Sequence, residues 1–222
     1  MTVFKAPKYI KDLFNQIAYK YDFMNNLMSF GTHKFIKREC IKMLNIQTHC
    51  KVLDACCGTG DLANFAKTIQ PLSEVTGADF SENMLAIAKN KFNNIKFIQT
   101  DITHLPFSDK EFDFVTMGFG LRNISNPEQA LTEIYRILKP GGKFLHLDFG
   151  KKNFAGKMFD ILTPILAKFF YGNSEPYRYL IKSKKEFPEP DELIKDFEKC
   201  GFSFKLSKEF IFGAISAQIM KK

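Results

Sequence analysis

Apolar residues recur in the first 50 residues at the spacing of one helix face. Phe14, Ile17, Ala18 and Tyr21 occupy positions i, i+3, i+4 and i+7, which is the pattern of an amphipathic helix. Residues 29–33 (SFGTH) interrupt the pattern, and it resumes in the sequence KFIKRECIKML. We therefore expect residues 1–50 to form a helical cap.

Between residues 51 and 150 the pattern changes to short apolar runs that alternate with helical periodicity. The expected strands are 51–55, 74–80, 95–101, 112–120 and 143–149, and the expected helices are 60–69, 81–92 and 126–138. Ser81 and Asn126 are predicted helix N-caps, and KPGG at 139–142 is predicted to stop the third of these helices. Strands that alternate with helices predict a parallel sheet wound on both faces.

The alternation ends after residue 150. Residues 151–189 are predicted to form a basic, aromatic insertion, residues 190–202 a helix, and residues 203–210 and 213–222 two antiparallel strands at one edge. The whole pattern predicts an α/β fold with a doubly wound, seven-stranded, mostly parallel Rossmann-like sheet. We expect one domain over residues 1–222, in which 51–150 binds a cofactor.

The strongest chemical signal is the segment KVLDACCGTGDLA at residues 51–63. Gly58, Gly60 and Ala63 fit a G-x-G-x-x-A motif that follows a strand and opens a helix, where backbone N–H groups can approach a ligand closely. Asp79 ends the next strand, nineteen residues after Gly60, and its carboxylate is expected to accept both ribose hydroxyl groups. This arrangement predicts an adenosine-type cofactor.

The charges around the loop favour S-adenosylmethionine over a nicotinamide cofactor. Asp54 stands four residues before Gly58, where a negative charge disfavours a pyrophosphate and suits sulfonium and amino groups. Asp101 ends the third strand and is expected beside the adenine. The candidate cofactor-binding residues are Asp54, Cys56, Gly58, Thr59, Gly60, Asp79, Phe80, Met84, Asp101, Ile102 and Gly118.

The five cysteines suggest neither a disulfide framework nor a metal site. Their number is odd, their spacing is irregular, and Cys56 and Cys57 are adjacent rather than spaced as zinc ligands are. We interpret these two as small side chains on the cofactor loop and expect a reducing, cytoplasmic compartment. The N-terminal segment has no apolar signal-peptide region, and no apolar run approaches the length of a membrane span.

The net charge of +8 is concentrated in one segment. Residues 151–185 contain eight Lys or Arg and two acidic residues, which leaves +6. This charge suits peripheral contact with an anionic membrane, and a solvated Lys-rich surface is the alternative. A nucleic-acid partner is not expected, because the fourth strand exits as GFGL rather than as an N-P-P-Y-like motif and no aromatic, basic binding module is evident.

The chain resembles the ubiquinone/menaquinone biosynthesis C-methyltransferases. The resemblance runs nearly end to end, and its most specific parts are FNQIAYKYDFMNNLMSFGTHKFIK (14–37), GFGLRN (118–123) and YRYLIKSKKEFP (177–188). It implies a class I S-adenosylmethionine-dependent methyltransferase that acts on a prenylated quinol, either demethylmenaquinol or the corresponding benzoquinol. The family often has Ser at the position of Gly118 and Glu at the position of Asp148.

Methyl transfer to a ring carbon requires help in removing a proton and in stabilising a phenolate. Arg122 is expected to face the quinol oxygen, although it could instead order its loop through a salt bridge. The candidate bases are Asp148, His146 and His33. Tyr177 and Tyr179 could hydrogen-bond the ring oxygens, and a packing role is the alternative.

The resemblance also bears on the insertion and on alternative functions. The large apolar residues of the insertion are expected to line a channel for a prenyl tail or to form core under a cap; they are Phe154, Met158, Phe159, Ile161, Leu162, Ile165, Leu166, Phe169 and Phe170. The alternative functions are O- or N-methylation of another small molecule and a non-catalytic cofactor-binding subunit. Homodimerisation is left open.

Overall fold

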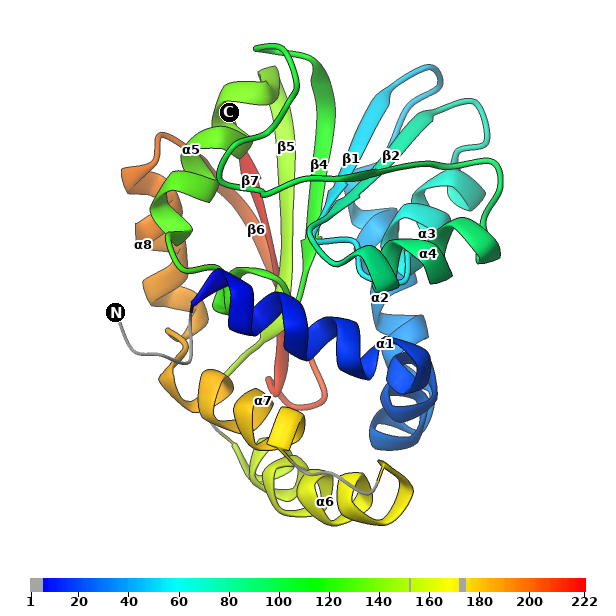
Figure 1. Ribbon diagram of the computed structural model, residues 1–222. Helices are drawn as coiled ribbons and strands as arrows, with labels where there is room; N and C mark the ends of the chain where they lie inside the picture. The colour runs from blue at the N-terminus through cyan, green and yellow to red at the C-terminus, as the bar shows by residue number, and fades with distance from the viewer. Residues whose placement is uncertain (1–5, 152, 172–174) are drawn as a thin grey trace.

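The strands form one seven-stranded sheet, as the sequence predicts. The computed structural model describes residues 6–151, 153–171 and 175–222. The sheet order is β3-β2-β1-β4-β5-β7-β6, with β7 antiparallel to both β5 and β6 and the remaining neighbours parallel (Figure 1). The strands are β1 Lys51–Ala55, β2 Glu74–Asp79, β3 Lys96–Gln99, β4 Phe112–Gly118, β5 Leu138–Phe149, β6 Ser203–Phe210 and β7 Ile215–Lys221.

Helices cover both faces of the sheet. The buried apolar side chains of α2, α3 and α4 join one core cluster with one face of the sheet, and those of α5 and α8 join a second cluster with the other face. The helices are α1 Pro7–Ser29, α2 Thr32–Leu44, α3 Asp61–Ile69, α4 Glu82–Lys91, the 3-10 helix η2 Leu121–Asn123, α5 Pro127–Ile137, α6 Phe154–Tyr171, α7 Glu175–Glu186 and α8 Pro190–Lys199.

The predicted helix caps are confirmed. The Ser81 side chain accepts a hydrogen bond from the backbone of Met84, and the Asn126 side chain accepts one from the backbone of Gln129. These local contacts satisfy N–H groups that the first turn of a helix leaves free.

The segment KPGG does end α5, but it is itself part of a strand, which the sequence analysis did not predict. β5 begins at Leu138, because Leu138 pairs with Phe112 of β4 ahead of a register shift. Gly141 has a left-handed φ of 83° and donates its backbone N–H to the carbonyl of Lys222. Long-range backbone pairing thus extends this strand beyond its apolar part.

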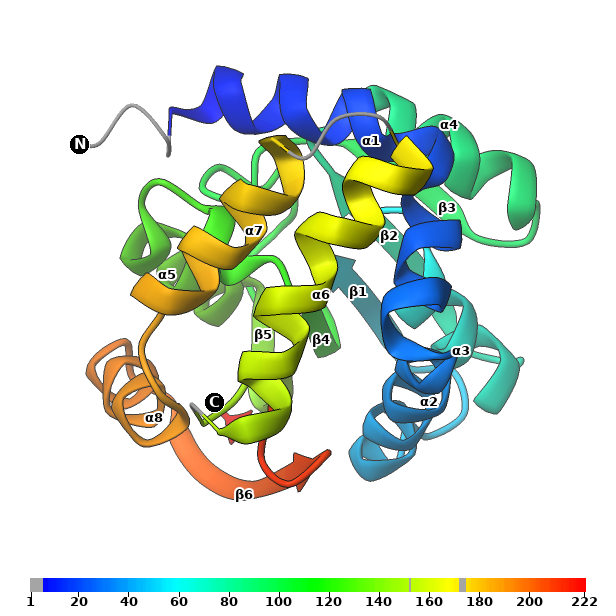
Figure 2. The same ribbon diagram turned by 90° about the horizontal axis from the view of Figure 1, so that it is seen from below.

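Two parts of the chain lie over the carboxyl ends of the parallel strands. Helix α1 crosses this edge, and α6 and α7 lie beside it, as Figure 2 shows from below. The insertion predicted at 151–189 therefore contributes two helices to the cap. In the described part of the chain, no helix combines the length and apolar character needed to cross a membrane.

Candidate active site

Two pockets open next to each other at the carboxyl edge of the sheet. The space over the first pocket, including the solvent at its mouth, is about 820 Å³, and that over the second is about 860 Å³. The sheet order reverses between β1 and β4, and ligands of open α/β sheets bind at such a point. Four residues line both pockets: Phe14, Tyr21, Phe119 and Asn123.

The glycine loop forms the floor of the first pocket. Cys56, Gly58 and Gly60 have left-handed φ values of 56°, 54° and 87°. A Cβ on Gly58 would meet no atom within 4 Å, so this glycine leaves open the space that a ligand would occupy. Asp79 holds the loop, since its Oδ2 accepts the Gly58 N–H at 2.8 Å.

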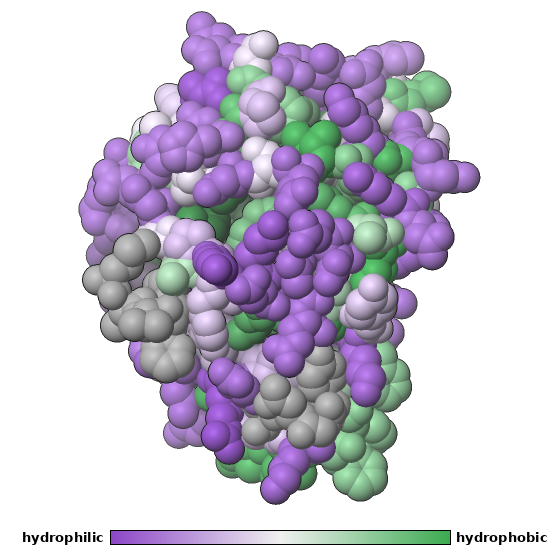
Figure 3. All heavy atoms as spheres, in the orientation of Figure 1, coloured by the Kyte–Doolittle hydropathy of each residue, from purple (hydrophilic) through white to green (hydrophobic). Residues whose placement is uncertain are grey.

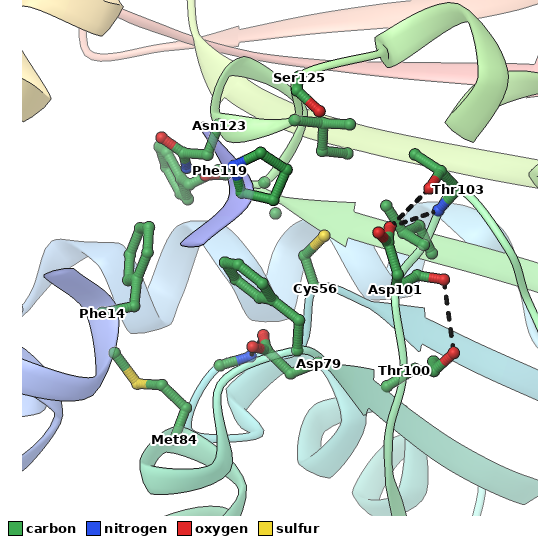
Figure 4. Close-up of a pocket in the computed structure, with 18 of the residues that line it drawn as sticks. Phe14, Cys56, Asp79, Met84, Thr100, Asp101, Thr103, Phe119, Asn123 and Ser125 are labelled. Atoms are coloured by element: carbon green, nitrogen blue, oxygen red, sulfur yellow. Dashed lines mark hydrogen bonds between the residues drawn. The ribbon is translucent and has the colours of Figure 1, made fainter. Parts of the chain in front are cut away.

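Eight of the eleven predicted cofactor residues line the first pocket. They are Cys56, Gly58, Asp79, Phe80, Met84, Asp101, Ile102 and Gly118. Figure 4 shows Asp101 and Asp79 approaching the pocket from different strand ends. The Asp101 carboxylate is fixed by the Thr103 backbone and hydroxyl, each at 2.8 Å. These two carboxylates give the pocket a negative rim that suits a cationic ligand.

Asp54 does not line the pocket, and this differs from the expectation that it faces the cofactor. It is buried beneath the loop, where its carboxylate accepts hydrogen bonds from the Ala63 backbone at 3.0 Å and from the Thr116 hydroxyl at 2.8 Å. Burial raises its pKa to about 7, against the opposing effect of these two hydrogen bonds. Asp54 therefore anchors the start of α3 to the sheet.

Thr59 and Gly60 also lie outside the pocket lining. The Thr59 hydroxyl donates to Asp22 of α1 at 2.6 Å, so it ties the loop to the cap. A Cβ on Gly60 would come within 3.0 Å of the Phe97 ring. Both residues shape the loop and its cover.

Helix α1 supplies residues that the sequence analysis missed. Phe14 and Tyr21 form an edge-to-face pair 6.5 Å apart and line both pockets. In the sequence both belong to an apolar stripe, which indicates a buried face without showing that a cavity lies beneath it. Asn15 holds the helix in place, because its Oδ1 accepts the Ser81 hydroxyl at 2.7 Å.

The thiol of Cys56 fits the predicted passive role. Burial raises its pKa well above the usual value, and the carboxylates of Asp79, Asp54 and Asp101 add to this shift. A thiol that stays protonated is a poor nucleophile.

A buried ion pair between Arg122 and Asp148 lies at the wall of the second pocket. The Arg122 Nη1 donates to Asp148 Oδ1 at 2.7 Å and to the Phe119 carbonyl at 2.9 Å. The guanidinium also lies over the Phe149 ring, 5.0 Å from its centre. Arg122 lines the pocket, whereas the fully buried Asp148 lines neither pocket. Arg122 and Asp148, two of the three residues predicted as catalytic, are thus in contact, and of this pair Arg122 is the one that reaches the cavity.

The model of the ubiE/COQ5 methyltransferase family matches residues 1–222. This chain belongs to that family. The predictions of an enzyme and of the S-adenosylmethionine-dependent methyltransferase class are confirmed.

Curated relatives of this family member are similar over most of their length. The demethylmenaquinone methyltransferase of Listeria welshimeri is 39% identical over 216 residues, 92% of this chain and 91% of the relative. The demethylmenaquinone methyltransferase of Staphylococcus aureus is 40% identical over 200 residues, 86% of this chain and 83% of the relative.

Solved structures share the fold at lower identity. A SAM-dependent methyltransferase from Aquifex aeolicus has a TM-score of 0.67 at 18% identity, covering 90% of this chain and 97% of that chain. The [4+2]-cyclase SpnF has a TM-score of 0.71 at 14% identity, and the match covers 96% of this chain and 95% of that chain. These likenesses confirm the fold. Because a cyclase shares it, the fold alone does not specify the reaction, which depends on the family and on the residues of the site.

His33 lies in the second pocket of this methyltransferase, beside a partly buried Lys37–Asp61 pair. The Lys37 Nζ donates to Asp61 Oδ2 at 2.8 Å, and His33 Nδ1 lies 4.0 Å from the same oxygen. Burial lowers the His33 pKa to about 4, and the nearby Lys37 adds to this effect while Asp61 opposes it. His33 is therefore neutral at physiological pH and a weak base.

Replacing His33 by Gln is expected to flatten the acid dependence of stability. Because the folded-state pKa of about 4 lies below the ordinary 6.5, the folded chain binds fewer protons than the unfolded chain between these values. The free energy of unfolding of the parent protein should then fall as the pH drops through this window, and the variant should lose this part of the fall. Urea unfolding at several pH values checks this, and equal slopes for both proteins would contradict it.

His146 is not at the site. Its ring is fully buried on the sheet face that α8 covers, 5.3 Å from the Phe197 ring, and its Nδ1 lies 2.9 Å from Gln218 Oε1. It lines neither pocket. Alternation along β5 placed His146 and Asp148 on one face, but only the packing shows that this face is closed.

The tyrosines of α7 do line the second pocket. The Tyr179 hydroxyl donates to Asn123 Oδ1 at 3.2 Å, and burial raises its pKa to about 12. Tyr179 therefore stays protonated and orients the Asn123 amide at the wall that the two pockets share.

Proposed function

We propose that this enzyme transfers the methyl group of S-adenosylmethionine to a ring carbon of a reduced prenylated quinol, with demethylmenaquinol as the substrate. The relatives named as demethylmenaquinone methyltransferases support this substrate class. The observation that carries the proposal is the second pocket, which abuts the first and combines an apolar lining with two buried cations, Arg122 and Lys37.

The first pocket suits S-adenosylmethionine, which supplies an electrophilic methyl group. Gly58 leaves room for close approach, Asp79 has lone pairs left for ribose hydroxyls, and Asp101 sits at the end where the adenine would lie. The shared wall of Phe14, Tyr21, Phe119 and Asn123 would then be where the reacting atoms meet, held in near-attack geometry.

Arg122 and Lys37 are the groups that would favour the reactive phenolate. Each is held by a carboxylate, Arg122 by the buried Asp148 and Lys37 by the partly buried Asp61. Burial lowers the pKa of Lys37, but Asp61 and its hydrogen bond outweigh this effect and the pKa is raised, so Lys37 is cationic. A cation facing a phenol oxygen lowers the cost of losing the phenolic proton.

The phenolic proton is lost to solvent before transfer. After transfer the ring proton leaves the methylated carbon and the oxygen is reprotonated, so each turnover releases one proton to solvent. In this assignment Arg122 and Lys37 stabilise the developing phenolate charge, and Asp148 is a positioning residue that orients the guanidinium. His33 remains a neutral hydrogen-bonding group.

A single-turnover assay tests the function. Labelled S-adenosylmethionine is mixed with short-tail demethylmenaquinol, with and without prior chemical reduction of the quinone. Carbon-methylated product is expected only with the reduced form, because only the quinol can form a phenolate whose negative charge is delocalised onto the ring carbon. Methylation at oxygen, or no product with either form despite cofactor binding, would contradict the proposal and favour another small-molecule acceptor.

The enzyme is expected to meet its substrate at a membrane. A prenylated quinol is a membrane lipid, and the charge of +6 over residues 151–185 favours the anionic inner face of the cytoplasmic membrane. We therefore infer peripheral association with that membrane.

A further inference from the structure

A stripe of large apolar side chains faces outward from α6. Phe154, Met158, Ile161, Ile165 and Phe169 are spaced by three or four residues, so they share one side of the helix. Ile161 is 59% exposed and Phe169 is 81% exposed. The apolar stripe of a surface helix ordinarily faces the core. Figure 3 shows green, apolar side chains at the lower edge of the molecule, where Figure 1 places α6.

This exposure corrects the expectation that these residues line a tail channel or form core. Phe159, on the opposite side of α6, is the residue of this helix that lines the second pocket. The inner side is also fixed by Asp160, which accepts Lys184 Nζ at 2.7 Å from α7. Helix α6 is therefore a wall, with the pocket on one side and the apolar stripe on the other.

The turn between β6 and β7 continues the stripe. Phe212 is 96% exposed, and the residues Ile211, Phe212 and Gly213 all have left-handed φ values, of 51°, 55° and 88°. Such values are outliers for a β-branched or bulky residue, and strain of this kind persists only when the surroundings impose it. The turn lies against the start of α6, because Asn153 Nδ2 donates to the Phe212 carbonyl and the Lys151 N–H donates to the Gly213 carbonyl at 2.7 Å.

The charge around this surface indicates its partner. Lys157 and Lys168 are exposed on α6, within the segment of net charge +6. A second copy docked face to face would bring two such segments together, which is unfavourable, whereas an anionic bilayer neutralises them. Lys157, Asp160 and Lys168 interrupt the apolar sequence of α6, so this helix suits the plane of the membrane interface.

We infer that the stripe of α6 and Phe212 together dock this enzyme on an anionic lipid bilayer. Docked in this way, α6 lies between the lipid and the second pocket. A quinol would then enter past α6 with its tail still in the bilayer, a part of the inference that rests on the proposed function.

Vesicle co-sedimentation of the full chain tests this surface without any measurement of activity. The probes are phosphatidylcholine vesicles with and without phosphatidylglycerol. The triple variant Ile161→Ser, Ile165→Ser and Phe212→Ser is compared with the parent protein. Leu72→Ser is the control. Leu72 is a large apolar residue, 57% exposed, in the turn that precedes β2, at the amino ends of the parallel strands and away from their carboxyl edge.

The parent and the control are expected to bind vesicles that contain phosphatidylglycerol, and added salt should weaken this binding. The triple variant should bind at least about tenfold more weakly, because each removed side chain loses its burial in the interface. Equal binding by the triple variant and the parent would overturn the inference, as would a dimer in analytical ultracentrifugation that the triple variant abolishes while no protein binds vesicles.

A parallel activity assay separates this inference from the proposed function. The triple variant should methylate short-tail quinol in solution at the parent rate, because none of its three positions lines a pocket. Vesicle binding without methyl transfer by the parent would leave the surface standing and defeat the proposed reaction. Methyl transfer by the parent without vesicle binding would support the proposed reaction and overturn the docking surface.

Discussion

Replacing Arg122 by Gln is expected to lower kcat for quinol methylation about 10²- to 10³-fold, the usual cost of removing one group that stabilises developing negative charge. Arg122 carries one of the two positive charges of the second pocket, and its guanidinium is covered by the Phe119 and Phe149 rings. The affinity for S-adenosylmethionine should change little, because Arg122 does not line the first pocket. Steady-state kinetics with reduced short-tail substrate and calorimetric titration of the cofactor measure the two effects.

The same substitution leaves the carboxylate of Asp148 buried without its partner, which costs about 3–5 kcal/mol of stability in comparable pairs. Arg122→Lys separates the two effects, because it keeps a charge for Asp148 but loses the planar fork that reaches several acceptors at once. We expect this variant to remain folded and still to lose most of kcat. A lysine variant with the parent kcat would show that the loop-ordering salt bridge is the whole role of Arg122.

Asp148→Asn distinguishes a positioning role from a base. If Asp148 only orients the guanidinium, the loss in kcat should be about tenfold, smaller than for Arg122→Gln, and the pH profile should keep its shape. A loss in Asp148→Asn larger than in Arg122→Gln, together with loss of the acidic limb of the pH profile, would assign the proton abstraction to Asp148.

Replacing Gly58 by Ala is expected to raise the Kd for S-adenosylmethionine about 100-fold, which corresponds to about 2.7 kcal/mol. The new methyl group would point into space that no protein atom occupies within 4 Å, at the floor of the first pocket. It would therefore meet the ligand rather than the protein. Isothermal titration with S-adenosylmethionine gives the affinity, and thermal unfolding gives the stability.

Gly31→Ala is the matched control for Gly58→Ala. Gly31 also has a left-handed φ, of 75°, and open space around its Cβ position, but it lines neither pocket. Both variants should lose about 1 kcal/mol or somewhat more of stability from the unfavourable backbone conformation. Only Gly58→Ala should lose cofactor affinity. Equal affinities in the two variants would remove Gly58 from the cofactor site.

Local chemistry was sufficient to predict most of the strands and helices outside residues 139–142 and 151–189, and most of the residues that line the first pocket. Ser81 caps a helix through its own neighbouring backbone, and Gly58 adopts a left-handed turn that any chain with this loop would need. Asp79 and Asp101 follow strands of a parallel sheet, and the carboxyl ends of such strands always meet at one edge. These inferences needed no knowledge of which distant residues pack together.

The direction in which a side chain points was decided by tertiary packing. Asp54 has the right spacing for a cofactor contact, but Thr116 of the neighbouring strand turns it beneath the loop. His146 shares a face with Asp148, and the helix that closes that face follows about fifty residues later. Sequence spacing specifies a face of a strand, and only the assembled layers determine whether that face meets solvent, a ligand or a helix.

The sequence by itself determined the sheet and the loop, because strand and helix periods, caps and left-handed glycines are properties of short segments. The methyltransferase class came from the acidic residues around that loop and from the resemblance to a family. The tertiary structure decided which residues line the second pocket and which side of α6 is exposed. The period of three to four in α6 is the same whether its stripe faces the core or a lipid bilayer. The side it faces depends on Asp160 and Lys184 meeting across two helices, a contact between residues 24 positions apart.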